Sequence, residues 1–360
     1  MAKFTGEVRI DGLAAGGEGV GRLEGRAIFV PGAFPGDVVS VTRGSLKKRW
    51  GRAEAWDLLE ASPDRRESPC AWSDRCGGCD WIGYDVDAQR AAKGTIVKDA
   101  LRRLGRLENV PESLDVVAAG PTLGWRRRVR LHVRQEIGFH ARRTRTIVPI
   151  DRCVVADERI NEALRGLRAE RPPAGTVTVQ IEGEGTATYR DEAPFVQANP
   201  AVNDRLVADV VAVARRRAVR FLELFAGGGN FSVPLAVAEL EGVTVESHPG
   251  AVQGARDAAS AAGVTDRLDI REGRAEDLLA APDGQPDLVL LDPPRAGAKD
   301  LMASIVALRP AWIAYVSCDP GTLARDLGLL QAGGYRLESV TAYDMFPHTH
   351  HVETVAWMQA

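Results

Sequence analysis

Five cysteines are the residues of this chain best suited to chemistry, and their spacing divides them into two groups. Cys70, Cys76 and Cys79 form a Cys-x5-Cys-Gly-Gly-Cys run, and Cys153 lies far downstream. An odd number of cysteines, with no apolar leader segment ahead of them, argues against a disulfide framework. The spacing therefore indicates four metal ligands and one nucleophile, Cys318.

Four thiolates can hold either zinc or a cubane iron–sulfur cluster. A zinc ribbon usually pairs two Cys-x2-Cys knuckles, whereas this chain has one knuckle, from Cys76 to Cys79, and two single cysteines. The pattern favours an iron–sulfur cluster, with zinc as the weaker alternative and unligated buried thiols as the third. A cluster would clamp residues 70–79 onto the strand region that ends near Cys153, which indicates a structural role.

Cys318 follows the apolar run 313–317 and is expected at the carboxyl end of a core strand. A buried structural cysteine is the alternative, because Cys is among the most buried residue types. The decision between the two depends on what surrounds Cys318, and above all on whether a cofactor pocket lies beside it.

A glycine-rich segment, 223–231, follows one short apolar strand and opens a helix. Glycines let a backbone turn sharply and approach a ligand closely, although a structural turn would explain them as well. Glu246 ends the next strand, where an acid binds the hydroxyls of a ribose. A nicotinamide cofactor would fit these two features. The pattern E-x-F-x-G-x-G and the sequence Asp292-Pro-Pro-Arg at a later strand end favour S-adenosylmethionine.

A cysteine beside a methyl donor suggests methylation at carbon 5 of a pyrimidine. That carbon is too weak a nucleophile to attack a sulfonium methyl, so a thiolate must first add to carbon 6, and a base must later remove the carbon-5 proton. Cys318 is the candidate nucleophile and Glu353 the candidate base. The neighbouring histidines are alternatives for the base, or could position it, and we give metal binding by them little weight: His348, His350 and His351.

The residue that follows the Asp-Pro-Pro motif bears on which pyrimidine is modified. Enzymes that act on cytosine in RNA generally carry a cysteine after the second proline of this motif. Here Arg295 follows Pro294, and Cys318 is the available thiol. The sequence therefore favours uracil over cytosine.

The hydrophobic pattern predicts three domains. Residues 1–60 alternate short apolar runs with Gly and Pro turns, which is typical of a small OB-like β-barrel. Residues 61–195 are expected to form a β-rich central domain, with a cysteine-bearing loop, strands over much of 125–190 and a helix over 88–107 that packs on the catalytic domain. Residues 196–360 alternate strands and helices, with a helix over 203–217, and this predicts an α/β domain with a doubly wound parallel sheet.

Composition is that of a globular protein, with 45% hydrophobic and 26% charged residues among 360. The formal net charge is −3, but eight arginines and one acid lie between Trp125 and Arg145. A second basic group consists of Lys47, Lys48, Arg49 and Arg52. Such clusters are either solvated faces or a footprint for nucleic acid. No apolar stretch is long enough to span a membrane, so we expect a cytoplasmic protein.

Taken in order along the chain, these motifs resemble the bacterial RNA uracil-5 methyltransferases, in the branch with a TRAM domain and an iron–sulfur cluster. The resemblance rests on the CGGC cysteines, FVQANP at 195–200, the glycine-rich loop, DPPRAG at 292–297, SCDP at 317–320 and FPHTHHVETV at 346–355. It implies a Rossmann-like class I methyltransferase domain and an N-terminal TRAM barrel that binds RNA. Departures are Asp319, where the family commonly has Asn, and Ala226, where Cys is frequent.

The resemblance also implies the roles of individual residues. Cys318 would be the nucleophile and Glu353 the base. The S-adenosylmethionine site would be lined by Gln197, Phe225, Asn230, Glu246 and Asp292. A [4Fe-4S] cluster would be held by Cys70, Cys76, Cys79 and Cys153.

The expected substrate is a uridine of 23S ribosomal RNA, because the branch with both extra modules resembles ribosomal RNA enzymes. The alternatives are tRNA uracil-5 methylation, RNA cytosine-5 methylation, and an RNA-binding iron–sulfur assembly factor with no activity. The presence of both Cys318 and Glu353 argues against the last. No obligatory protein partner is expected, and we expect a monomer.

Overall fold

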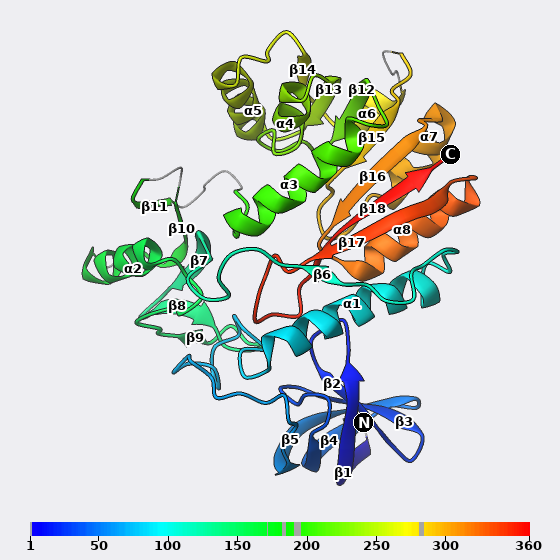
Figure 1. Cartoon of the computed structure of the whole chain (residues 1–360). Helices are drawn as coiled ribbons and strands as arrows, with labels where there is room; N and C mark the ends of the chain where they lie inside the picture. The colour runs from blue at the N-terminus through cyan, green and yellow to red at the C-terminus, as the bar shows by residue number, and fades with distance from the viewer. Residues whose placement is uncertain (1, 171, 182–184, 191–195, 281–283) are drawn as a thin grey trace. The chain divides into compact units, whose positions relative to one another are not determined.

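The computed structural model describes residues 2–170, 172–181, 185–190, 196–280 and 284–360. The chain divides into two compact units, each assembled from segments that are distant in sequence (Figure 1). The first unit comprises Met1–Ile96, Pro121–Asp191 and Phe346–His351, and the second comprises Val97–Gly120, Glu192–Met345 and Val352–Ala360. The three-domain division of the sequence stays a prediction.

A closed barrel of five strands, in the order β1-β2-β3-β5-β4, opens the first unit. Its strands are β1 (Ala2–Leu13), β2 (Gly19–Leu23), β3 (Arg26–Val30), β4 (Val38–Leu46) and β5 (Trp50–Glu60). Alternate side chains such as Val8 and Ile10 fill the interior, as the period of a strand requires. Gly44 leaves room for the ring of Phe4, which a Cβ atom would meet at 2.2 Å. The predicted N-terminal barrel is confirmed.

The rest of the first unit is a sheet in the order β11-β10-β7-β8-β9 with one covering helix. Its elements are β7 (Arg128–Val133), β8 (Ile137–His140), β9 (Ile147–Val148), α2 (Glu158–Glu170), β10 (Gly175–Ile181) and β11 (Ala187–Arg190). Strands were expected over much of 125–190, and helix α2 was not predicted. The helix buries Ile160, Leu164 and Leu167, whose spacing of four and three residues forms one apolar face.

The second unit is built on an eight-stranded sheet in the order β14-β13-β12-β15-β16-β18-β17-β6. Its strands are β6 (Val116–Val117), β12 (Arg220–Leu224), β13 (Glu241–Glu246), β14 (Leu268–Glu272), β15 (Leu288–Leu291), β16 (Trp312–Ser317), β17 (Arg336–Tyr343) and β18 (Glu353–Gln359). The five strands from β14 to β16 are parallel, and β18 runs antiparallel to both of its neighbours. The predicted doubly wound sheet is confirmed.

The helices of this unit are α3 (Pro200–Ala214), α4 (Ser232–Val237), α5 (Pro249–Ala261), α6 (Ala275–Ala280), η1 (Lys299–Leu301), α7 (Met302–Leu308) and α8 (Pro320–Ala332). The order of the strands reverses between β12 and β15, and ligands of such sheets bind at the carboxyl ends of the strands at that point. Helix α3 begins three residues earlier than predicted, because Asn199 accepts a hydrogen bond from the Val202 amide and Pro200 occupies the first turn.

Helix α1 (Val86–Arg103) is shorter than the predicted 88–107, and the division between the units falls within it. Ile96, Val97 and Leu101 are buried as predicted. Leu104, assigned to the same apolar face, is 66% exposed because the helix has ended before it. Within the described ranges no helix is both long and apolar enough to cross a membrane.

Candidate active site

The register of β16 and β18 brings the predicted nucleophile and base together. Ser317 pairs with Thr354 in the antiparallel strands β16 and β18. Cys318 follows Ser317 and Glu353 precedes Thr354, so these two residues lie opposite each other at one end of the strand pair. Leu291 pairs with Tyr315 on the other side of β16, and Asp292 leaves β15 at the same edge. One edge of the sheet therefore holds a thiol and two carboxyl groups.

The surroundings of Cys318 favour the neutral form of its thiol. Burial, followed by the nearby Glu353 and Asp292, raises its pKa to about 11. Arg295 opposes this rise, both by its charge and by a hydrogen bond to the sulfur. The guanidinium is thus the group at the site that stabilises the thiolate.

Glu353 is 6% exposed, and burial raises the pKa of its carboxyl well above the ordinary value. The negative charge of Asp292 acts in the same direction, whereas Arg295 lowers the pKa of Glu353. Burial likewise raises the pKa of Asp292. Two buried carboxyl groups close to each other resist being charged together, so burial and repulsion favour a proton on one of them.

The segment after Cys318 is fixed by the start of helix α8. The carboxylate of Asp319 accepts a hydrogen bond from the Thr322 amide at 2.8 Å and so caps the helix. Asp caps a helix as well as the commoner Asn does. The departure at this position therefore leaves the local structure intact, and Cys318 lies directly before the positive end of the helix.

Arg295 is a residue to which the sequence analysis gave no role in the chemistry. Thr322 donates a hydrogen bond to the Arg295 carbonyl at 3.2 Å, and Arg325 donates to the Ala296 carbonyl at 2.9 Å. Asp326 accepts from the Ala298 amide at 2.8 Å. Helix α8 therefore positions the whole segment that carries Arg295. The signal available in the sequence was the Arg directly after Asp-Pro-Pro.

The glycine-rich loop has a left-handed backbone at three alternate positions, with φ of 62° at Phe225, 55° at Gly227 and 85° at Gly229. A non-glycine residue there is strained, and such strain is concentrated at functional sites. Glu246 supports the loop, because its carboxylate accepts hydrogen bonds from the Gly227 amide at 3.0 Å and the His248 amide at 2.8 Å. The predicted ribose-binding acid thus lies against the predicted loop.

Asn230 is fixed by a reciprocal pair of amide hydrogen bonds with Asn203 of α3, at 2.9 and 3.1 Å. Gln197 is half-buried in the segment before α3. Its neighbour Phe195, part of the FVQANP motif, lies outside the described residues. All five predicted cofactor residues belong to the second unit.

Glu223, the first residue of the E-x-F-x-G-x-G pattern, is completely buried at the end of β12. Burial raises its pKa to about 8, with further contributions from Asp292 and Glu246, while Ser232 opposes the rise. The sequence predicted no role for this residue. Near neutral pH it carries a proton at the edge where the other acids lie.

Comparison with known proteins decides the family. The family described as tRNA (Uracil-5-)-methyltransferase matches residues 176–285 and 282–360, and the family described as tRNA (uracil(54)-C(5))-methyltransferase, TRAM domain, matches residues 7–63. This chain belongs to the RNA uracil-5 methyltransferase family.

Relatives of this methyltransferase cover almost its whole length. An uncharacterized RNA methyltransferase of Streptomyces avermitilis is 33% identical over 98% of each chain. The 23S rRNA (uracil(1939)-C(5))-methyltransferase RlmD of Pseudomonas putida is 32% identical and covers 98% of this chain and 93% of its own. The crystal structure of the Pyrococcus abyssi tRNA (uracil-54, C5)-methyltransferase with S-adenosyl-L-homocysteine is 25% identical, with a TM-score of 0.76 over 98% of this chain and 99% of its own.

The other four cysteines of the methyltransferase line one cavity in the first unit. Burial raises the pKa of Cys76 and Cys153, and raises that of Cys79 to about 12. The Gly78 amide donates to the Cys76 sulfur at 3.4 Å, and Asn161 of α2 exchanges two hydrogen bonds with the backbone of Cys153. Among the described residues, however, no three His, Cys, Asp or Glu side chains form a group that could hold one metal ion.

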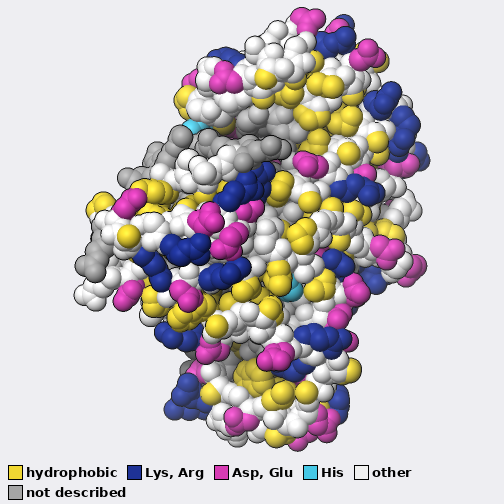
Figure 2. Space-filling model, turned by 60° about the vertical axis from the view of Figure 1, so that its left-hand side comes forward, with side chains coloured by type: hydrophobic (Ala, Val, Ile, Leu, Met, Phe, Trp, Pro, Cys, Tyr) yellow, Lys and Arg dark blue, Asp and Glu magenta, His cyan; other side chains and the backbone are white. Residues whose placement is uncertain are grey.

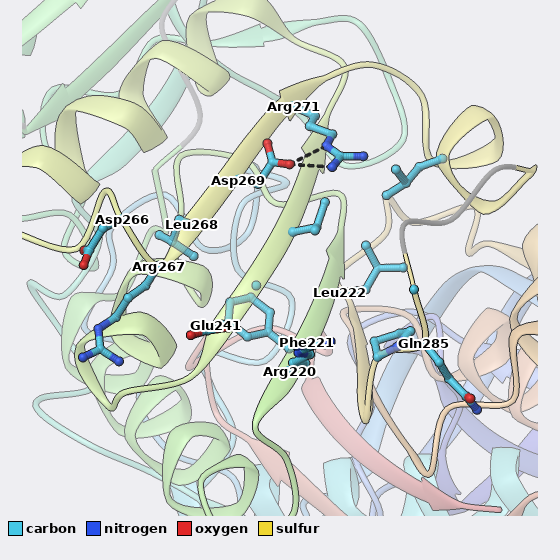
Figure 3. A pocket seen from close by; sticks show the side chains of 15 residues that line it. Arg220, Phe221, Leu222, Glu241, Asp266, Arg267, Leu268, Asp269, Arg271 and Gln285 are labelled. Carbon is cyan, nitrogen blue, oxygen red and sulfur yellow. Dashed lines mark hydrogen bonds and ion pairs between the residues drawn. The ribbon is translucent and has the colours of Figure 1, made fainter.

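A separate hollow of about 350 Å³ lies far from the chemistry of the methyltransferase (Figure 3). Its walls include Arg220, Glu241 and Leu268, the first residues of β12, β13 and β14. Because these strands are parallel, the hollow is at the opposite edge of the sheet from the glycine-rich loop. The ion pair of Asp269 and Arg271 lies at its side (Figure 3).

Proposed function

We propose that this methyltransferase transfers a methyl group from S-adenosylmethionine to carbon 5 of a uridine in 23S ribosomal RNA, with Cys318 as the nucleophile and Glu353 as the base. The observation that carries the proposal is the pairing of Ser317 with Thr354, which sets the thiol and the carboxyl group side by side. Arg295 beside both of them supplies the positive charge that each ionised group needs.

The chemistry begins with a uracil that has left its stack, because carbon 6 cannot be reached within one. Cys318 loses its proton to water, Arg295 stabilises the thiolate, and the sulfur bonds to carbon 6 while the electron pair of the double bond moves onto carbon 5 as an enolate. S-adenosylmethionine, when bound, supplies an electrophilic methyl group to the activated carbon 5. Arg295 stabilises the ionised form of Glu353, which takes the carbon-5 proton as the double bond re-forms and the thiolate of Cys318 leaves carbon 6.

The loop geometry fits S-adenosylmethionine. Phe225, Gly227 and Gly229 bend the backbone so that a ligand can approach it. Glu246 accepts hydrogen bonds from two amides and from the Ser247 hydroxyl, and its carboxylate still has acceptor capacity for a ribose hydroxyl. We assign Gln197, Asn230 and Asp292 to the same site.

The proposed RNA target is supported by relatives whose names include 23S rRNA (uracil(1939)-C(5))-methyltransferase, at 32% identity over nearly the full length. The alternative is tRNA, because the matching families and the Pyrococcus abyssi enzyme are named for tRNA. Mapping 5-methyluridine in both RNA pools of a strain that lacks the protein distinguishes them. Loss from 23S rRNA alone supports the proposal, and loss from tRNA alone overturns it.

We assign RNA binding to the barrel and to the arginines of 126–145, in keeping with a cytoplasmic RNA substrate. On the face shown in Figure 2, Lys and Arg side chains lie in small groups with acidic side chains among them. The β7 strand carries Arg128, Arg130 and His132 at alternate positions. Burial, followed by repulsion from Arg130, lowers the pKa of Arg128, and burial, followed by repulsion from His140, Arg130 and Arg134, lowers the pKa of His132. An RNA phosphate would relieve this repulsion.

We assign a [4Fe-4S] cluster to Cys70, Cys76, Cys79 and Cys153, with zinc as the alternative. The four thiols line one cavity but form no group suited to a single ion, and a cubane holds its four thiolates farther apart than one tetrahedral zinc does. The cluster stabilises the loop, since methyl transfer needs no electron. Protein purified without oxygen should be brown and contain iron and sulfide in equal amounts. Colourless protein that contains zinc would overturn the cluster.

The decisive test of the mechanism uses RNA that contains 5-fluorouracil, in which fluorine replaces the hydrogen that the base must remove. The wild-type protein should form a covalent complex with this RNA that survives denaturing electrophoresis. Cys318→Ala should form none. The proposal fails if the wild type forms no complex with 23S rRNA or with tRNA that contains 5-fluorouracil, or if the alanine variant still forms one.

A further inference from the structure

The segment directly before Glu353 is gripped by residues that no part of the proposed chemistry uses. Residues 346–351 join β17 to β18 but belong to the first unit, together with the cysteine loop and the start of α1. Glu353 follows this segment after a single residue, Val352. Whatever fixes residues 346–351 therefore also limits where the Glu353 carboxyl can lie.

Asp80 is the first of these anchors. It directly follows Cys79 in the cysteine loop. Its carboxylate accepts a hydrogen bond from the His350 amide at 3.2 Å, and its other oxygen lies 2.7 Å from Nδ1 of the His350 ring. A carboxylate that contacts both the backbone and the side chain of one residue fixes its position and its orientation together.

Gln89 of α1 is the second anchor, and it is completely buried. Its side-chain oxygen accepts from the His348 amide at 2.9 Å, while its nitrogen lies 3.2 Å from Nδ1 of His348. The same nitrogen donates to the Trp81 and Tyr84 carbonyls at 3.0 and 2.7 Å. Gln89 thus joins the segment to the stretch that follows the cysteine loop.

Two further backbone contacts complete the anchoring. The buried Lys93 donates to the Phe346 carbonyl at 3.0 Å, and the Trp81 amide donates to the His348 carbonyl at 3.0 Å. His348 has a left-handed backbone, with φ of 66°. A non-glycine residue keeps such a conformation only where its surroundings impose it.

The turn between β1 and β2 of the barrel closes on the same place. A Cβ atom on Gly17 would lie 2.0 Å from Asp80 Oδ2 and 2.9 Å from His350 Nδ1. Trp81 donates from its indole to the Gly17 carbonyl at 2.9 Å. Only a residue without a side chain fits against the pair of Asp80 and His350.

We propose that Asp80 and Gln89 are positioning residues for the proton-removal step, because they hold residues 346–351 and through them Glu353. The proposal rests on the proposed function of Glu353. Its consequence is specific to one step. Addition of Cys318 to carbon 6 and methyl transfer to carbon 5 do not use Glu353, whereas removal of the carbon-5 proton and cleavage of the bond to sulfur do.

The test is a single-turnover reaction with uridine RNA and methyl-labelled S-adenosylmethionine, in which labelled RNA bound to protein is separated from labelled free RNA under denaturing conditions. Glu353→Gln provides the reference and should accumulate methylated RNA bound through Cys318. Asp80→Ala should accumulate the same species, with release slowed on the order of 10- to 100-fold, since small displacements of a reacting group have such effects. Asp80→Asn keeps an acceptor for the His350 amide and should restore part of the rate.

Gly17→Ala tests the same anchor from the barrel side, because it leaves both side chains of the pair present but displaces them. Its partition between bound and free methylated RNA should shift in the same direction. Asp87→Asn is the matched control, since Asp87 lies at the start of α1, its side chain is 90% exposed and it forms an ion pair with Arg90. The control should behave as the wild type does.

The outcomes separate the two hypotheses. If Glu353→Gln accumulates no bound methylated RNA, Glu353 is not the base and both hypotheses fall. If Glu353→Gln accumulates it but Asp80→Ala releases product as fast as the wild type, the positioning role alone is wrong. The positioning role is also wrong if Asp80→Ala slows methyl transfer and adduct formation with 5-fluorouracil RNA as much as it slows release, because a general loss of structure would do that.

Discussion

Two places in this methyltransferase bury thiols, and they differ in what surrounds the sulfur. Burial raises the pKa of Cys79 to about 12 and that of Cys318 to about 11. The residues lining the cavity of Cys79 include three other cysteines and two arginines but no carboxyl group. Cys318 has Glu353, Asp292 and Arg295 beside it. Thiols among thiols favour a shared cation, whereas a thiol beside an acid and a guanidinium favours proton transfer.

The largest effects are expected when one thiol is removed from each of the two places. Cys318→Ala should abolish methylation completely while leaving iron content and thermal unfolding unchanged. Cys79→Ala should lose the metal and lower the unfolding temperature, and its residual protein should still form some adduct with 5-fluorouracil RNA. Iron analysis, thermal melting and denaturing electrophoresis on both variants measure this. If Cys318→Ala loses iron, the cluster depends on Cys318 as well, and if Cys79→Ala keeps its iron, Cys79 is not a ligand of the cluster.

Arg295→Ala should sharpen the distinction at the active site. Arg295 is the group that lowers the pKa of Cys318, so its loss raises that pKa further, and less thiolate exists at a given pH. The rate of adduct formation should fall on the order of 10²-fold, and its rise with pH should move to more alkaline values. Arg295→Lys should restore part of the rate, because the charge returns without the planar donor group.

The pH profile of Arg295→Ala distinguishes this role from a structural one. A variant that is merely destabilised loses rate equally at all pH values and shows no alkaline displacement. An unchanged profile, at whatever rate, contradicts the assignment of Arg295 to the thiolate.

The buried acid Glu223 should make the free energy of unfolding depend on pH. Its pKa rises from 4.5 to about 8 on folding, so between these values the folded state binds more protons than the unfolded state does. The free energy of unfolding must therefore fall as the pH rises through this window. Glu223→Gln keeps the shape of the protonated acid and should reduce this fall by a few kcal/mol. Urea unfolding of both proteins at pH 5 and pH 8 measures the difference. If the free energy of unfolding changes equally in both proteins between these pH values, Glu223 is already ionised.

The active-site residues could be predicted from the sequence because each of them lies next to an apolar strand that the sequence pattern shows. Cys318, Glu353, Asp292 and Glu246 each end or begin an apolar strand, and parallel strands bring their carboxyl ends to one edge. The roles of these residues stay predictions that the experiments above address. The barrel was predictable for a similar reason, because its strands are joined by short turns rich in Gly and Pro.

What could not be predicted depends on contacts between distant residues. Asp80 and His350 are 270 positions apart, and nothing in either neighbourhood indicates the other. Helix α2 was missed although its apolar face keeps the spacing of a helix, because that face consists of a few residues within a strongly charged stretch. Leu104 was assigned to the core because apolar spacing alone does not show where a helix ends.

The smallest effect is expected from Asn203, which holds Asn230 beside the glycine-rich loop. Its loss should weaken cofactor binding without changing the chemistry of Cys318. Asn203→Ala removes both hydrogen bonds to Asn230, at 2.9 and 3.1 Å, and leaves the Asn230 amide free to turn away from the loop. The two hydrogen bonds orient Asn230, and losing them should cost about 1 kcal/mol of binding free energy, which weakens S-adenosylmethionine binding about 5-fold. Adduct formation with 5-fluorouracil RNA at saturating cofactor should not change, because Cys318 is held by β16 and α8. Asp204→Ala, on the exposed side of α3, is the control, and calorimetric titration of the cofactor measures all three proteins. Equal affinity in Asn203→Ala and the wild type would show that Asn230 does not need its partner to line the site.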